Sequence, residues 1–208
     1  MDGGRLSALQ RRALELLAGL EPPWTLAGDG AIVGFVLGHR ATRDLDLFWR
    51  DRSQLGAIVR VVQERFVAAG LAVQTLQTSP AFVRLRVADG EEVLVVDLIA
   101  APIQPVETPV EVAPGVFVDT AHELLVQKLC TLLSRSEPRD LEDTRALIAA
   151  GGDLDRALGD AARRDGGFSP PTLAWLLESY PLEQAARLGF DPQALAAFRD
   201  WLREALLK

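Results

Sequence analysis

Two aspartates spaced one residue apart, Asp44 and Asp46, are the side chains of this sequence best suited to chemistry. They lie in the segment DLDLF, residues 44–48, whose alternation of polar and apolar residues predicts a short β-strand. Because successive side chains of a strand point to opposite faces, the two carboxylates share one face, roughly 6.5 Å apart. Mg²⁺ takes oxygen ligands and commonly binds one or two carboxylates plus substrate phosphates. The pair therefore indicates a divalent-cation site; the alternative is an edge strand with a solvated acidic face.

The residues before this strand are suited to binding phosphate. Glycines stand at positions 28, 30, 34 and 38, and Arg40 and Arg43 follow. A glycine-rich turn lets backbone N–H groups approach phosphate oxygens closely. The apolar run from Ala31 to Leu37 predicts a short buried helix, whose first N–H groups would face an anion near Gly30. A phosphate-binding turn followed by an acidic pair is the arrangement that nucleotide chemistry needs.

At this point the chain resembles a known family. The stretch LGHRATRDLDLF, residues 37–48, is similar to the signature of the AbiEii/AbiGii-type nucleotidyltransferases, often toxins of bacterial toxin–antitoxin pairs. They belong to the superfamily that includes DNA polymerase beta. The family pattern has a Gly-Gly-Thr or Gly-Gly-Ser turn, a short helix, Gly-His-Arg, a small hydroxyl residue and Asp-x-Asp. Thr42 fills the hydroxyl position, whereas the turn reads Asp29-Gly30-Ala31 and lacks the hydroxyl on the phosphate side.

The resemblance implies roles for these residues. Asp44 and Asp46 would bind Mg²⁺ or Mn²⁺, and Gly30, Arg40 and Thr42 would lie near the bound nucleotide. The reaction implied is metal-dependent transfer of a nucleoside monophosphate from a nucleoside triphosphate to an acceptor. The family implies that the acceptor is tRNA or a protein, and that a cognate antitoxin is a partner.

A third carboxylate, Asp97, lies inside the apolar run VLVVDLI, residues 93–99. A carboxylate in such surroundings is costly unless it is paired or bound to a metal. One interpretation is a strand-end aspartate that faces water. The other is the third acid of the metal site, which the family also takes from a later strand, and which would help to deprotonate the acceptor.

The later, helical part of the chain has one informative segment. Lys128 and Arg135 are seven residues apart and therefore share a helix face. Asp140 and Asp143 follow in the first turns of a second helix and, three residues apart, are neighbours on its surface. Taken alone, the pattern also fits a solvated face with an i,i+4 pair between Arg139 and Asp143. The family assigns Lys128 to the triphosphate, and Asp140 and Asp143 to positioning nucleotide or acceptor. We expect Lys128→Ala to weaken triphosphate binding and leave stability similar.

Periodicity and turn signals place these residues in an α/β fold. Helices are expected over residues 5–20, 52–69, 154–164, 171–179, 182–188 and 192–207, besides the two that carry Lys128 and Asp140. Strands are expected over residues 24–27, 44–48, 71–76, 81–87 and 92–100, followed by a proline-rich connection over residues 102–114 and a short apolar piece over residues 116–118. Residues 28–30 are expected to form a turn, and Asp89-Gly90 signals a hairpin. Trp175, Leu176, Phe198, Trp201 and Leu202 are expected to pack as core. We therefore predict a nucleotidyltransferase fold over residues 1–118, with a small mixed sheet flanked by helices, and a helical domain over residues 119–208.

Composition limits the kinds of partner, compartment and site that the chain can have. The chain has 208 residues and a net charge of −7, which argues against broad nonspecific nucleic-acid binding without excluding a local basic groove. Cys130 is the only cysteine, so no internal disulfide can form and the reducing cytoplasm is the expected compartment. No run approaches the ~18 apolar residues of a membrane span, so no membrane association is expected. There is no Walker A motif or Cys/His cluster, which excludes a P-loop protein and disfavours a zinc site.

The leading hypothesis is an NTP-dependent nucleotidyltransferase of the toxin type. Two alternatives stay open at this point. A small-molecule nucleotidyltransferase of the antibiotic-modifying kind would suit the acidic balance. A non-catalytic relative that binds nucleotide would suit Ala31 in the phosphate turn.

Overall fold

A mixed sheet of seven strands dominates the first part of the chain in the structure, a computed structural model that describes residues 5–208. The strands are β1 (Thr25–Ala27), β2 (Asp44–Arg50), β3 (Ala72–Thr78), β4 (Phe82–Asp89), β5 (Glu92–Ala101), β6 (Val110–Ala113) and β7 (Val116–Val118). Their order across the sheet is β3-β4-β5-β2-β1-β7-β6. The β1–β7 and β2–β5 pairs are parallel and the other pairs are antiparallel. The predicted α/β class with a mixed sheet is confirmed.

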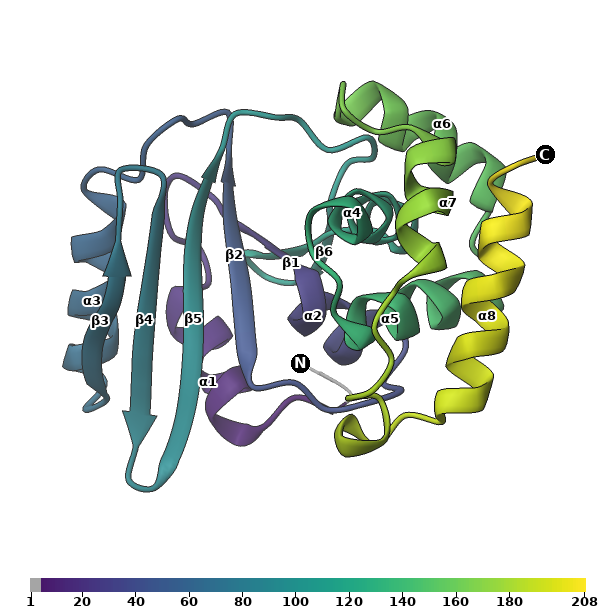
Figure 1. Cartoon of the computed structure of the whole chain (residues 1–208). Coiled ribbons are helices and arrows are strands. Elements are labelled where there is room, and N and C mark those ends of the chain that lie inside the picture. Colours follow the sequence, from purple (N-terminus) through teal and green to yellow (C-terminus); the bar gives the residue numbers. More distant parts are fainter. Residues whose placement is uncertain (1–4) are drawn as a thin grey trace. The chain divides into compact units, whose positions relative to one another are not determined.

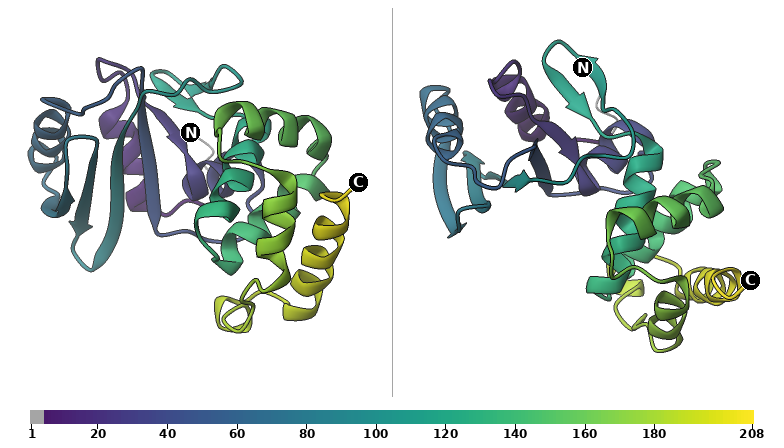
Figure 2. Two further views of the ribbon diagram at one scale, coloured as in Figure 1. Left: turned by 45° about the horizontal axis from the view of Figure 1, so that its top comes forward. Right: turned by 90° about the horizontal axis from the view of Figure 1, so that it is seen from above.

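Helices cover one face of this sheet. They are α1 (Ala8–Leu17) and α3 (Ile58–Ala68), which lie on the same side of the strands in Figures 1 and 2. On β2, the alternate residues Leu45, Leu47 and Trp49 are fully buried. Because side chains alternate along a strand, Asp44 and Asp46 lie on the opposite face, where both are only partly buried. The strand thus uses its apolar face for the core and leaves its acidic face accessible.

Three segments of this unit differ from expectation. The predicted turn at residues 28–30 is the start of helix α2 (Gly28–Ala31), which runs into a π-helical turn, η1 (Ile32–Val36). The helix expected from residue 52 begins only at Ile58, because Gly56 adopts a left-handed backbone with φ +54°. Where a proline-rich connection and a short apolar piece were expected, over residues 102–118, the chain forms strands β6 and β7, which pair as a hairpin. That hairpin turns at Gly115, which has φ +71°.

The chain divides into two compact units, one ending at Thr120 and the other running from Ala121 to Lys208. The second unit contains α4 (Ala121–Ser134), α5 (Pro138–Ala149), α6 (Leu154–Arg164), α7 (Pro170–Glu178) and α8 (Pro192–Ala205). Of the helix expected over residues 182–188, only a 3-10 turn, η2 (Ala186–Leu188), is present, and Gly189 ends it in the left-handed conformation. His122 lies 2.6 Å from Asp160, and Glu123 pairs with Arg164, so two polar contacts join α4 to α6.

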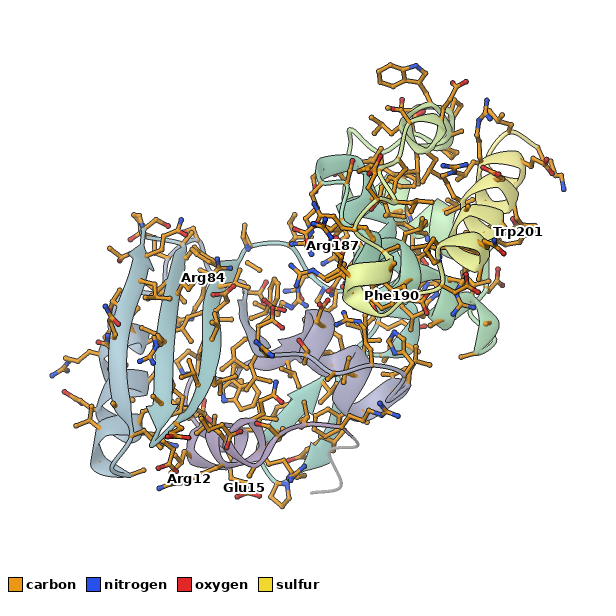
Figure 3. All side chains as sticks on the ribbon, turned by 60° about the horizontal axis from the view of Figure 1, so that its bottom comes forward. Arg12, Glu15, Arg84, Arg187, Phe190 and Trp201 are labelled. Carbon is orange, nitrogen blue, oxygen red and sulfur yellow. The ribbon has the colours of Figure 1, made fainter. Side chains whose placement is uncertain are left out.

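The prediction that the aromatic residues of this unit pack as core is wrong for both tryptophans. Trp175 is 69% exposed and Trp201, labelled on α8 in Figure 3, is 46% exposed. Helix α7 buries Leu173 and Leu177, which are four residues apart, and Trp175 lies between them on the opposite side. Trp201 stacks on Phe198 with ring centroids 5.5 Å apart, while its neighbour Leu202 is buried.

Within the part of the chain that the structure describes, no helix is both long and apolar enough to cross a membrane.

Candidate active site

Register places two of the three predicted metal-binding carboxylates side by side. Strands β2 and β5 are parallel neighbours, and Asp46 lies directly opposite Asp97. Asp44 lies opposite Val95, on the same face of the sheet. Asp97 is buried, whereas Asp44 and Asp46 are partly accessible. The strand pairing therefore brings together Asp44, Asp46 and Asp97 from segments about fifty residues apart in sequence.

The glycines before β2 make room for the aspartates of that strand. A β-carbon built on Gly28 would overlap the Asp46 carboxylate, and Gly28 also has a left-handed φ of +57°. At Gly30, a β-carbon would lie 3.0 Å from the Leu45 side chain and 3.3 Å from the Asp44 carbonyl oxygen. Gly28 therefore requires a residue without a side chain, and Gly30 leaves little room for one. The start of α2 consequently packs directly against the residues that carry the carboxylates.

The residues between α2 and β2 are held by polar contacts. The Thr42 hydroxyl donates a hydrogen bond to the Asp44 carboxylate. The Arg40 guanidinium lies 2.6 Å from the buried Asp29 carboxylate. Arg40 and Asp29 thus neutralise one another at the turn, where Asp29 stands at the position of the first glycine of the family pattern. Ala31, which stands in place of the hydroxyl residue, is fully buried.

Sequence analysis missed Arg84, which is paired with Asp97. Arg84 on β4, labelled in Figure 3, lies directly across the strand pair from Asp97. Its Nε and Nη2 atoms donate to the two Asp97 oxygens at 2.8 and 2.6 Å. The hydrogen bond to Asp97 raises the pKa of Arg84, and the charges of Asp46 and Asp44 act in the same direction. The predicted hairpin does not lead to this contact, because a loop at Asp89-Gly90 would set Phe82 opposite Asp97. The observed loop at Gly90-Glu91 makes Arg84 the partner instead.

A second residue that the sequence did not single out is Gln10, on α1. Its side chain is buried, and its amide nitrogen donates to the carbonyl oxygens of Thr42 and Asp44, both at 3.3 Å. Its amide oxygen accepts from the Ser7 N–H at 2.8 Å, completing a capping box at the start of α1. One side chain therefore caps a helix and fixes the backbone that enters the acidic strand. No local pattern reveals the second contact, because it spans more than thirty residues of sequence.

In the second unit, the predicted nucleotide-binding residues form one buried ionic cluster. Lys128 on α4 places Nζ 2.8 Å from an oxygen of Asp140 and 2.8 Å from an oxygen of Asp143, both on α5. Arg135 completes the cluster with two hydrogen bonds to Asp140, at 2.7 and 3.0 Å. Arg139 pairs with Glu137 at 2.6 Å. The structure therefore brings Lys128, Asp140 and Asp143 together within the helical unit.

The expectation that Lys128 could be replaced without a cost in stability is wrong. Its side chain is only 5% exposed, and both of its carboxylate partners are fully buried. Removing one member of a buried charge cluster leaves the others unpaired in a poorly solvated site. The helix that carries Lys128 is apolar over most of its circumference, which is typical of a buried helix, so the sequence held a sign of this burial.

The donor set of the first unit fits a divalent cation. Asp44, Asp46 and Asp97 are hard oxygen ligands on one face of adjacent strands, as Mg²⁺ or Mn²⁺ would require. Among the residues that the structure describes, these three are not yet gathered to within 4.8 Å of one another. A cavity of about 920 Å³ lies at the other end of β2, beside Arg50, Trp24 and Phe117, and none of the predicted site residues lines it.

Comparisons with known proteins identify a family and a fold for this chain. Residues 12–206 match the sequence model of a family described as nucleotidyl transferase AbiEii toxin, type IV toxin–antitoxin system. No curated protein sequence matches the chain. The structure is similar to the nucleotidyltransferase toxin MenT4 from Mycobacterium tuberculosis H37Rv, with a TM-score of 0.59 and 19% identity over 95% of this chain and 80% of that one. It is also similar to JHP933 from Helicobacter pylori, with a TM-score of 0.56 and 18% identity over 95% and 88% of the two chains. At these identities the two structures show a common fold.

Proposed function

Because the chain belongs to the AbiEii family of nucleotidyltransferase toxins and is therefore an NTP-dependent nucleotidyltransferase, we propose that it transfers a nucleoside monophosphate to tRNA or to a protein with the help of a divalent cation. The observation that carries this proposal is the register of β2 and β5, which sets Asp46 opposite Asp97 on the face that also holds Asp44. A family match and a converging set of hard ligands are independent, and both point to the same chemistry.

The proposed reaction joins an acceptor oxygen to the α-phosphorus of the triphosphate. The bond from that phosphorus to the bridging oxygen breaks, pyrophosphate leaves, and the proton of the acceptor hydroxyl passes to Asp97 as general base. Asp44, Asp46 and Asp97 would hold the cation, which is Mg²⁺ or Mn²⁺. When bound, the cation would supply positive charge beside the reacting phosphoryl oxygens. The hydroxyl of Thr42 orients the Asp44 carboxylate for this task.

The remaining site residues would bind the nucleotide. We assign Lys128 to the triphosphate, since an ammonium group makes strong charge-assisted hydrogen bonds to phosphate oxygens. Asp140 and Asp143 hold its Nζ in position. The backbone of Gly30, with Arg40 and Thr42, would lie beside the nucleotide at the start of α2. Arg40 would reach phosphate only by leaving Asp29, so its contribution depends on that exchange.

Membership in a toxin family also implies an antitoxin. We propose that a cognate antitoxin restrains the transfer reaction, in keeping with the toxin–antitoxin description of the family. The test of the proposed function does not require this partner, because the toxin itself carries the catalytic residues.

The experiment offers the purified protein each of the four radiolabelled nucleoside triphosphates with Mn²⁺ or Mg²⁺, and either total tRNA or total protein as acceptor. We expect label on one acceptor class, lost when EDTA removes the cation. Asp46→Asn should abolish transfer, whereas Glu64→Gln, which alters only an exposed pair with Arg60, should not. Labelling of neither acceptor class by any of the four nucleotides would contradict the proposal, as would equal labelling by Asp46→Asn.

A further inference from the structure

The contact between Arg84 and Asp97 occupies one of the three proposed cation ligands. Both Asp97 oxygens accept from the guanidinium, at 2.8 and 2.6 Å. The two side chains differ in access, since Asp97 is 7% exposed and Arg84 is 44% exposed. The carboxylate is therefore fixed in the strand pair, whereas the guanidinium lies at the surface of the site. If one of the two partners moves, it is Arg84.

A divalent cation and the Arg84 guanidinium would compete for Asp97. Both are positive, and a cation held by Asp44, Asp46 and Asp97 would stand close to the guanidinium, so the two charges would repel. The pair is bidentate and charge-assisted, so it orients Asp97 while no cation is bound. Because the Arg84 side chain is 44% exposed, water can solvate the guanidinium when it leaves Asp97, and a divalent cation that takes the carboxylate can therefore displace it.

In its paired position Arg84 also contacts an aromatic ring. Its guanidinium carbon lies 5.5 Å from the centre of the Phe82 ring, two residues earlier on the same face of β4. An arginine over an aromatic ring keeps a favourable contact while its N–H groups face outward. A guanidinium that leaves a carboxylate offers a planar pair of donors, which matches the geometry of a phosphate group.

We propose that Arg84 is an exchangeable partner of Asp97: it neutralises Asp97 while no cation is bound and, once a divalent cation takes that carboxylate, it binds a phosphate oxygen of the nucleoside triphosphate. This inference rests on the proposed function, because it needs the cation to bind Asp97. Arg84 then has two opposing effects. It weakens binding of the cation alone and strengthens binding of the triphosphate.

The experiment measures these two affinities separately by titration calorimetry. Wild type, Arg84→Gln and Arg86→Gln are titrated with Mn²⁺ alone, and then, in saturating Mn²⁺, with the α,β-methylene analogues of ATP, GTP, CTP and UTP. Arg86 is the matched control, since it lies two residues further along the same face of β4, opposite Val95 instead of Asp97. We expect Arg84→Gln to bind Mn²⁺ about fivefold more tightly, because a competing positive charge is gone. It should bind the preferred analogue about tenfold more weakly, because one charge-assisted contact is lost. Arg86→Gln should change each affinity by no more than about twofold.

The outcomes separate this inference from the proposed function. Loss of Mn²⁺ binding in Asp46→Asn supports the cation site itself, whatever Arg84 does. If that holds and Arg84→Gln leaves Mn²⁺ affinity unchanged, or weakens both affinities, Arg84 is a fixed structural anchor and the exchange is refuted. If wild type binds no Mn²⁺, the cation site and the exchange both fail. Should Arg84→Gln not fold, Arg84→Lys is tested in its place, because lysine keeps the positive charge and loses the planar pair of donors. Mn²⁺ should then bind more tightly and the nucleotide analogue more weakly, each by less than in Arg84→Gln.

Discussion

At the scale of single residues, Lys128 serves two purposes that are hard to separate. It is the proposed triphosphate ligand, and it is also the counter-ion of Asp140 and Asp143, which have no solvent exposure. A loss of activity in a Lys128 variant would therefore be ambiguous unless stability is measured as well.

We predict that Lys128→Met lowers the free energy of unfolding by about 3 kcal/mol or more, because two buried carboxylates lose their shared cation. Arg135 is the control, since it also contacts Asp140 but is largely exposed. Arg135→Met should cost no more than about 1 kcal/mol. Urea unfolding followed by circular dichroism measures both values. Equal costs for the two variants would mean that Lys128 is as well solvated as Arg135.

At the scale of elements, the first helix is tied to the acidic strand through Gln10. Its amide oxygen caps α1, and its amide nitrogen holds the carbonyls of Thr42 and Asp44. The two halves of this side chain can be tested apart, because glutamate retains the accepting oxygen and loses the donor.

We expect Gln10→Glu to keep α1 capped, since glutamate is a natural member of a capping box. Its second oxygen would face two carbonyl oxygens, so the entry to β2 should shift. Ser7→Ala is the counterpart: it removes the hydroxyl that accepts from the Gln10 N–H, at a cost of about 1 kcal/mol, and leaves the donor in place. Mn²⁺ affinity by calorimetry should fall several-fold for Gln10→Glu and stay unchanged for Ser7→Ala. The reverse order would show that capping of α1, not the tie to β2, positions the site.

Most elements of the fold follow from local patterns. The alternation of DLDLF and the Asp89-Gly90 signal predicted β2 and the β4–β5 hairpin, because strand period and turn chemistry act over a few residues. The same logic failed for β6, which lies in a proline-rich segment and is stabilised by its pairing with β7. It also failed for Trp175, whose apolar character says nothing about which side of α7 meets the core.

In the site, the carboxylates were predictable from the sequence and their hydrogen-bond partners were not. Asp44 and Asp46 could be nominated because alternate residues of a strand share a face, and Asp97 because an acid inside an apolar strand is costly. Their partners could not, because Arg84 depends on a register that one residue in the loop shifts, and Gln10 depends on the packing of a distant helix. Lys128, Asp140 and Asp143 were placed in one motif by the family resemblance, and the three side chains do meet in the helical unit.

At the scale of the whole molecule, the chain should act as a growth inhibitor through its chemistry. A toxin that works by nucleotidyl transfer needs its carboxylates, whereas one that works by sequestering a partner does not. Asp46 separates these cases, because it is only partly buried and replacing a carboxylate by its amide isostere disturbs packing little.

We predict that induced expression of the wild-type chain arrests a bacterial host, and that Asp46→Asn restores growth. The reason is a loss of transfer rate of at least roughly a thousandfold, as expected when a group on which the chemistry depends is removed. Glu64→Gln should arrest growth as wild type does, because its exposed pair with Arg60 at 3.5 Å is remote from β2 along the chain and contributes little. Colony counts after induction measure the effect, with immunoblots to show that the three proteins accumulate equally. If Asp46→Asn arrests growth at the same protein level, the arrest does not come from nucleotidyl transfer, and binding of a host component would be the mechanism to pursue.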